Sequence, residues 1–236
     1  MKKLLLPLAI FGMCGSVSYA QQIEPFNYPV ASDITKHNGW SKPTNNPSVP
    51  VIKVEDKELN KIGIIQTKSI RLKGESGQLL LNINSASGFE EGKTSSASPF
   101  YAAFPILVNE GSKDGFFCGL RSGSNVRYKI YIKNVSGGFQ LGLQVYDESP
   151  VYDKKNTYAY NLTHQLVFKW KESIPRQADL YVTGADMPAI EPGKSQISLP
   201  STNSAQKFPQ FLINQFEGSD MYIGGIVIKN DWPVGE

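Results

Sequence analysis

The sequence predicts an all-β protein, built as an antiparallel sandwich of two sheets. Two observations support this prediction. Long windows with apolar residues at i, i+3, i+4 and i+7, the pattern of an amphipathic helix, are nearly absent. Short runs that alternate apolar and polar residues recur instead, and Gly, Ser, Asn, Asp and Pro separate them. This arrangement is typical of short strands joined by turns.

The clearest alternating runs lie in the middle of the chain. In 126–133 one face carries Val126, Tyr128, Ile130 and Ile132, and the other carries Arg127, Lys129, Tyr131 and Lys133. A glycine-containing turn at 134–138 leads into 139–146, with Phe139, Leu141, Leu143 and Val145 inward and Gln140, Gln144 and Tyr146 outward. A third run, 164–171, places Leu166, Phe168 and Trp170 on one face. All three runs predict half-buried strands.

Further strands are expected at 51–54, 62–66, 69–73, 78–84, 101–109, 115–121, 179–183, 211–214 and 222–229. Long loops are expected at 85–99 and 184–209. No charge block, repeat or hydrophilic linker marks a boundary, so 21–236 is expected to form a single domain.

The first 20 residues have the pattern of a signal peptide. Two lysines precede an apolar stretch, and Ser18-Tyr19-Ala20 ends in a small-x-small cleavage pattern. Cleavage after Ala20 would export the chain to the periplasm, the outer-membrane surface or the medium. A lipoprotein signal at Cys14 is the alternative, but Phe11-Gly12-Met13 fits lipoprotein processing poorly. No later stretch is apolar enough to span a membrane, which needs about 20 residues.

The charge of the expected mature chain is almost balanced. Removing Lys2 and Lys3 from 24 basic residues leaves 22 against 21 acidic ones. No Lys/Arg cluster stands out, so neither a nucleic-acid nor an anionic-membrane partner is predicted. Cys118 would then be the sole cysteine, without an intramolecular disulfide. It is expected to be a buried, inert thiol on the same face as Phe116 and Leu120.

Catalytic patterns are missing. Retaining glycoside hydrolases need two carboxylates about 5–5.5 Å apart, and no strand carries acids at alternating positions. Asp147, Glu148 and Asp153 are predicted to be solvated turn residues. His164 is expected at an edge or turn, and His37 has no neighbour pattern that suggests pairing. Asp114 and Asp220 each offer a single carboxylate, so neither a metal nor a cofactor is predicted.

Several stretches together resemble a known kind of domain. Phe26-x-Tyr28-Pro29, Asn38-Gly39-Trp40 and Asn46-Pro47 are similar to the opening of β-sandwich domains in secreted proteins of Bacteroidota. The stretches 129–133, 138–143, 157–161, 166–169, 179–182 and 224–228, the last followed by Trp232, resemble the later strands of those domains. The resemblance implies a concanavalin A-like (laminin-G-like) jelly roll with one concave sheet. It says little about function, because such sandwiches host many activities.

The outward tyrosines suggest a ligand-binding surface. Flat rings beside amide and cationic donors can bind sugars, because the ring stacks on the C–H face and the donors bind hydroxyls. The candidate residues are Arg127, Lys129, Tyr131, Gln140, Gln144 and Tyr146, with Tyr181 and Lys169 as further members. The simpler interpretation is that tyrosine is merely a favoured strand residue. Trp40, Trp170 and Trp232 are expected to be core or closing residues.

These observations favour a non-catalytic binding protein of the bacterial envelope, with a glycan or another envelope protein as its ligand. Two alternatives stay open. One is a glycan-active hydrolase or lyase whose acids come from separate strands. The other is a structural component of an envelope assembly. The sequence decides neither the ligand nor the oligomeric state.

Overall fold

The computed structural model describes residues 21–37, 39–43, 51–59, 61–62, 65–83, 99–171, 176–184, 188–200 and 210–233. The expected signal segment, 1–20, lies outside these ranges, as does 85–98 of the first expected loop. No helix in the described ranges is long and apolar enough to cross a membrane.

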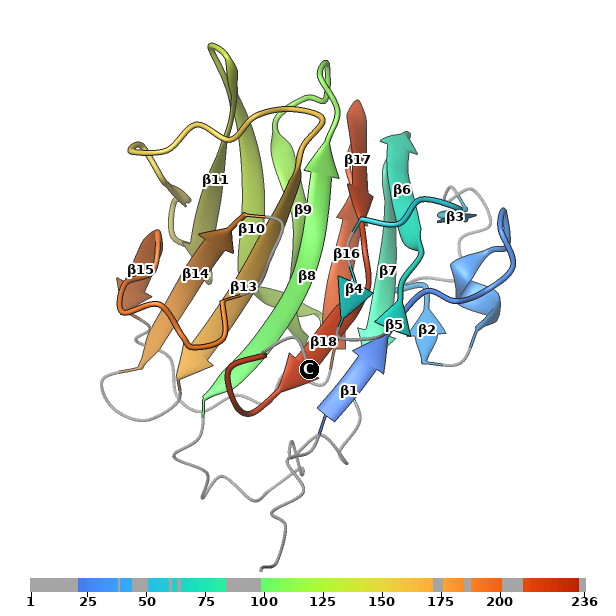
Figure 1. The fold of residues 1–236 in the computed structure, drawn as a ribbon, viewed down its shortest axis with the longest axis horizontal. Helices are drawn as coiled ribbons and strands as arrows, with labels where there is room; N and C mark the ends of the chain where they lie inside the picture. Colours follow the sequence, from blue (N-terminus) through green and yellow to red (C-terminus); the bar gives the residue numbers. More distant parts are fainter. Residues whose placement is uncertain are drawn as a thin grey trace, which may run out of the picture.

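Two antiparallel sheets stack face to face (Figure 1). The first sheet has seven strands in the order β12 (Val151–Tyr152), β11 (Gly138–Val145), β10 (Asn125–Val135), β9 (Gly115–Ser122), β16 (Gln210–Gln215), β7 (Gly77–Asn82) and β2 (Trp40–Ser41). The predicted all-β, two-sheet sandwich is therefore confirmed.

The second sheet has nine strands. Its main path is β15 (Ile197–Pro200), β14 (Gln177–Thr183), β13 (Thr163–Lys171), β8 (Phe100–Val108), β17 (Ser219–Ile223), β6 (Ser69–Gly74) and β3 (Val54–Glu55). β18 (Ile226–Lys229) pairs with both β8 and β1 (Gln21–Glu24). A separate hairpin joins β4 (Lys61–Ile62) to β5 (Ile65–Gln66), and the 3-10 turn η1 spans Ile34–Lys36.

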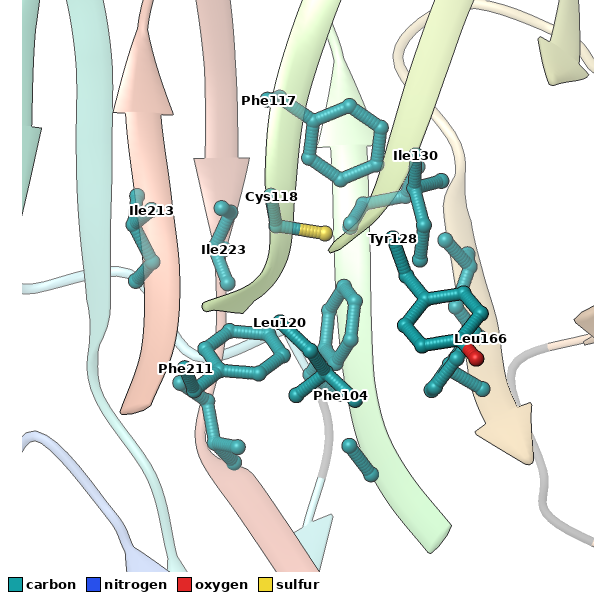
Figure 2. Packing of buried hydrophobic residues seen from close by; sticks show 14 of the residues in the cluster. Phe104, Phe117, Cys118, Leu120, Tyr128, Ile130, Leu166, Phe211, Ile213 and Ile223 are labelled. Atoms are coloured by element: carbon teal, nitrogen blue, oxygen red, sulfur yellow. The ribbon is translucent and has the colours of Figure 1, made fainter. Parts of the chain in front are cut away.

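Large apolar side chains from both sheets fill the space between them (Figure 2). Phe104 of β8 meets Phe211 of β16 with ring centroids 5.4 Å apart, and Tyr128 of β10 meets Phe168 of β13 at 5.5 Å. Trp40 and Trp170 belong to this core, as predicted. Removing these rings from water is the main stabilisation of a sandwich.

A β-bulge changes which side chains of β9 point into the core. Ile130 pairs with Cys118 but the next residue, Tyr131, pairs with Phe116, so Phe117 is an extra residue on β9. Phe117 and Cys118 both enter the core, while Phe116 turns to the outer face. The expectation that Phe116 shares a face with Cys118 is therefore wrong. Cys118 is fully buried, and burial raises the pKa of its thiol well above the usual value.

The predicted strand at 222–229 is two strands, β17 and β18, which separate at Gly224. Opposite this break lies Pro105 of the central strand β8. In an antiparallel pair the N–H and C=O of one residue point to the same side. The Pro105 carbonyl accepts from the Gly224 N–H at 3.0 Å. The nitrogen of Pro105, which carries no hydrogen, therefore also points to the break. The strands part where β8 cannot donate a hydrogen bond.

Other differences concern short strands. β1, β2, β12 and β15 were not predicted, and β15 lies within the second expected loop, 184–209. The predicted strand at 62–66 is instead part of the β4–β5 hairpin. Between β10 and β11 the predicted turn is present, with Gly137 at φ 81°.

Candidate binding surface

Three aromatic rings form a row across the outer face of the seven-stranded sheet. Phe116 of β9 and Tyr131 of β10 have ring centroids 5.9 Å apart, and Tyr131 and Tyr152 of β12 have centroids 6.4 Å apart. All three side chains are partly exposed. The row therefore presents aromatic surface to solvent across three strands.

The backbone of β11 creates the space for this row. Gly142 pairs with Tyr131 on one side and Tyr152 on the other. A Cβ atom on Gly142 would lie 2.7 Å from the Tyr152 ring. Because glycine has no side chain, Tyr152 can lie over β11 beside Tyr131. The glycine is thus what allows two aromatic residues to meet across an intervening strand.

Cationic and amide groups surround the rings. The Nζ atom of Lys129 lies 5.8 Å from the Phe116 centroid, and that of Lys133 lies 5.3 Å from the Tyr152 centroid. The Tyr131 hydroxyl donates to Oε1 of Gln144. We call this set the aromatic face; it comprises Phe116, Tyr131, Tyr152, Lys129, Lys133, Gln140 and Gln144.

Both phenols of the aromatic face stay protonated at neutral pH. Burial raises the pKa of Tyr131, and the neighbouring Tyr152 adds to this. Burial also raises the pKa of Tyr152, with the charge of Asp114 as the second cause. Protonated phenols can donate hydrogen bonds to a ligand but are poor nucleophiles.

The six predicted binding residues divide into two groups. Lys129 pairs with Gln144 across β10 and β11, and Gln140 and Tyr131 lie on the same face. Arg127 lies apart, at a second bulge, with its guanidinium carbon 4.2 Å from the Tyr146 ring centroid. The prediction that Tyr146 points outward is wrong. The chain has left β11 at this residue, at φ 57°, and the ring packs against the core.

Sequence reasoning missed two members of the aromatic face and left a third, Lys133, outside the candidate set. Phe116 was missed because the bulge at Phe117 inverts the alternation. Tyr152 was missed because two residues, the length of β12, show no periodicity. Lys133 does occupy the face predicted for it, opposite Gln140.

Part of the outer face of the nine-stranded sheet is covered. Tyr101, Tyr181 and Trp232 form a second apolar cluster there, and the Trp232 indole donates to the Pro188 carbonyl at 2.9 Å. Trp232 thus closes an outer face, not the core between the sheets. Tyr181 was predicted to lie with Tyr131 but sits on the opposite sheet and is only 5% exposed.

Glu191 joins the tyrosines of that cluster. Its carboxylate accepts from the Tyr101 hydroxyl at 2.8 Å, the Tyr181 hydroxyl at 2.5 Å and Nζ of Lys169 at 2.6 Å. Burial opposes ionisation, yet the bonds from Lys169 and the two phenols outweigh it and lower the pKa of Glu191. Burial and the bond to Glu191 raise the pKa of both tyrosines. With its pKa lowered beside phenols whose pKa values are raised, Glu191 holds these side chains in place and is poorly suited to transfer protons near neutral pH.

Two other carboxylates are buried and held by donors. Glu24 accepts from the Trp40 indole at 2.8 Å and the Tyr28 hydroxyl at 2.9 Å. Asp153 accepts from the Tyr158 hydroxyl and the Asn156 amide, each at 2.7 Å. The prediction that Asp153 is a solvated turn residue is wrong, because this network buries it. Asp147 and Glu148 are exposed, as predicted.

The two histidines make polar contacts that are local in sequence, whereas Asp114 and Asp220, the latter in β17, contact residues distant in sequence. Nε2 of His37 lies 3.0 Å from Oγ of Ser32, and Nε2 of His164 lies 3.0 Å from the Ala159 carbonyl near the start of β13. Asp220 forms an ion pair with Arg71 at 3.0 Å, and Asp114 accepts from the Asn134 N–H at 2.7 Å. Within the described ranges, no three His, Cys, Asp or Glu side chains gather in a way that could hold a metal ion.

Comparison with known proteins gives only distant likenesses. No protein-family model matches the chain, and no curated protein matches it. Among solved structures, the receptor-binding domain of botulinum neurotoxin D is similar, with 13% identity and a TM-score of 0.46 over 85% of this chain and 50% of that one. A Trypanosoma rangeli sialidase has 10% identity and a TM-score of 0.45, over 82% and 30%.

A third structure, the CBM2 module of the evolved Dit of Lactobacillus casei BL23 phage J-1, has 9% identity and a TM-score of 0.46 over 92% of each chain. The present chain thus spans half or less of the first two proteins. Likenesses this distant carry no argument about what this chain binds or does.

Proposed function

We propose that this chain is an exported, non-catalytic binding protein of the bacterial envelope that binds a glycan on its aromatic face. One observation carries the proposal. Three rings lie in a row on the outer face of the sheet, and the side chains of Lys129, Lys133 and Gln144 lie beside them. Rings can stack on the C–H faces of sugars, and amides and ammonium groups can bind the hydroxyls.

The chemistry of the aromatic face supports binding over catalysis. None of the seven strands of its sheet contains an aspartate or glutamate. Glycoside hydrolysis normally uses two such groups, one as acid and one as base or nucleophile. The phenols of Tyr131 and Tyr152 have raised pKa values, which makes them unsuited to act as bases near neutral pH.

Export is part of the proposal and rests on the signal-like pattern of residues 1–20. Expression of the full chain in a bacterial host, followed by N-terminal sequencing of the exported product, tests it. We expect the mature protein to begin at Gln21. Retention of an uncleaved chain in the cytoplasm would refute this part.

Binding is tested on purified residues 21–236 with a glycan array, followed by calorimetry on the best ligand. We expect Tyr131→Ala and Tyr152→Ala each to weaken binding about 2- to 10-fold, because an aromatic contact contributes about 0.5–1.5 kcal/mol. Tyr222→Ala is the matched control, since Tyr222 lies on the other sheet. Circular dichroism and melting curves verify that each variant folds.

Two results would contradict the proposal. One is full affinity in both Tyr131→Ala and Tyr152→Ala. The other is equal loss in Tyr222→Ala, which would place the ligand elsewhere. Capture of an envelope protein that competes with no glycan would favour a protein ligand instead.

A further inference from the structure

We infer that the aromatic face selects acidic saccharides, those that bear carboxylate or sulfate groups, over neutral ones. This inference rests on the proposed function and names its ligand class. It follows from the charge difference between the two sheets. The net charge of the whole chain is nearly balanced and does not reveal this difference.

The two sheets differ in their charged residues. The strands of the seven-stranded sheet contain four basic residues and no acidic one; the basic residues are Arg121, Arg127, Lys129 and Lys133. The strands of the nine-stranded sheet are mixed, with Arg71, Lys73, Lys169, Lys171 and Lys229 against Glu24, Glu55, Asp179 and Asp220. Counted over the strands, the positive excess is four on the sheet that carries the aromatic face (4 − 0) and one on the other sheet (5 − 4).

Two of these basic groups flank the middle ring. Lys129 and Lys133 lie two residues before and after Tyr131 on β10, so alternation puts all three side chains on the outer face. Their ammonium groups lie near the rings of Phe116 and Tyr152. The ion pairs Arg71–Asp220 and Lys169–Glu191 of the described residues do not involve these lysines.

Both lysines can therefore bind an anionic ligand group without first breaking a described ion pair. A ring between two ammonium groups fits a sugar that stacks on Tyr131 and carries an anionic substituent at its edge. Such charge-assisted hydrogen bonds are stronger than those between neutral groups.

The charge of Asp114 acts on this arrangement. Asp114 comes just before β9, and its charge is felt at Tyr152. Its Oδ1 accepts from the Asn134 N–H, next to Lys133 in sequence. Asp114 thus offsets the positive charge at the Lys133 end of the face. We expect Lys129 to contribute more to anion recognition than Lys133.

The probe is one oligosaccharide in two charge states, an oligogalacturonide as the free acid and as its methyl ester. A sulfated and a neutral glycan from the array give a second pair. We expect the acidic member of each pair to bind about 5- to 10-fold tighter in 50 mM NaCl, with most of this preference lost in 500 mM NaCl. Lys129→Met should remove most of the preference, and Lys133→Met a smaller part.

Lys73→Met is the matched control, because Lys73 is exposed on a strand of the other sheet. It should leave the preference unchanged. Equal binding of the acidic and neutral members would overturn the inference but leave the proposed function intact. Binding of no glycan at all would refute both.

Binding to double-stranded DNA or anionic vesicles as tight as to the acidic glycan, and unaffected by Tyr131→Ala, would also overturn the inference. It would show that the face attracts any polyanion through charge alone.

Discussion

Replacing Glu191 with glutamine should loosen the cover over the outer face of the nine-stranded sheet. The glutamate carboxylate accepts three hydrogen bonds, from Lys169, Tyr101 and Tyr181. Glutamine has nearly the same shape but lacks the charge, and only its single amide oxygen can accept. Its NH₂ group would face donors, so at least one of the three donors loses its partner.

The magnitude follows from the exposure of the cluster. Hydrogen bonds to charged groups contribute about 1.5–3 kcal/mol each when buried, but exposed ion pairs contribute about 0.2–1 kcal/mol. The side chains of Lys169 and Glu191 are 17% and 27% exposed, between these limits. We expect Glu191→Gln to lower the free energy of unfolding by about 2 kcal/mol. For a chain of this size that is a fall in Tm of about 4–8 °C.

The effect should depend on pH in a stated direction. The pKa of Glu191 is lowered in the folded protein, so its stabilisation is fully present above the unfolded pKa, about 4.3. It is lost as the pH falls through the folded pKa. The stability difference between wild type and Glu191→Gln should therefore be constant near pH 7 and shrink below about pH 4.

Urea unfolding at pH 7 and at successively lower pH measures this difference. Glu148→Gln is the matched control, because Glu148 is an exposed turn residue, and it should change stability by less than about 0.5 kcal/mol. The reasoning is refuted if both variants have the same midpoint as wild type, or if the Glu191→Gln difference persists unchanged at pH 3.

Three further predictions concern the interior. Gly119→Ala should be strongly destabilising in urea unfolding, because its Cβ would lie 2.1 Å from the Tyr128 carbonyl oxygen, whereas Gly193→Ala, with nothing within 4 Å, should not be. Phe104→Ala should lower the free energy of unfolding by about 3–5 kcal/mol through the cavity it leaves in the core (Figure 2), against less than about 0.5 kcal/mol for the exposed Leu162→Ala. The thiol of Cys118 should resist an aromatic disulfide reagent in the native protein and react on unfolding; fast native reaction would contradict its burial and raised pKa.

The fold class could be predicted because most strands have one face in the core. In β10 and β13 the apolar residues alternate, and these residues meet between the sheets. The limits of alternation appear where both faces are covered. Every residue of β8 is buried, so its sequence is one apolar run with no preferred face. Tyr181 was predicted to face solvent, and alternation could not show that Trp232 and Glu191 cover its side of the sheet.

Only part of the candidate site could be predicted, because the rest depends on features that the alternation of apolar and polar residues does not reveal. One extra residue, Phe117, puts Phe116 beside Tyr131. One missing side chain, at Gly142, allows Tyr152 to approach from a two-residue strand. The positive charge of the face emerges only when the strands are assigned to their sheets. Lys129, Tyr131, Gln140 and Gln144 were predicted because they lie on two long, regular strands joined by a tight turn.

The central claim is that a glycan stacks on the outer face of the seven-stranded sheet. An NMR titration of the ring resonances of Phe, Tyr and Trp with the best array ligand tests it most directly. We predict saturable shifts for Phe116, Tyr131 and Tyr152, with Tyr101, Tyr181 and Trp232 unchanged. Shifts confined to the second group, or spread evenly over both, would contradict the claim.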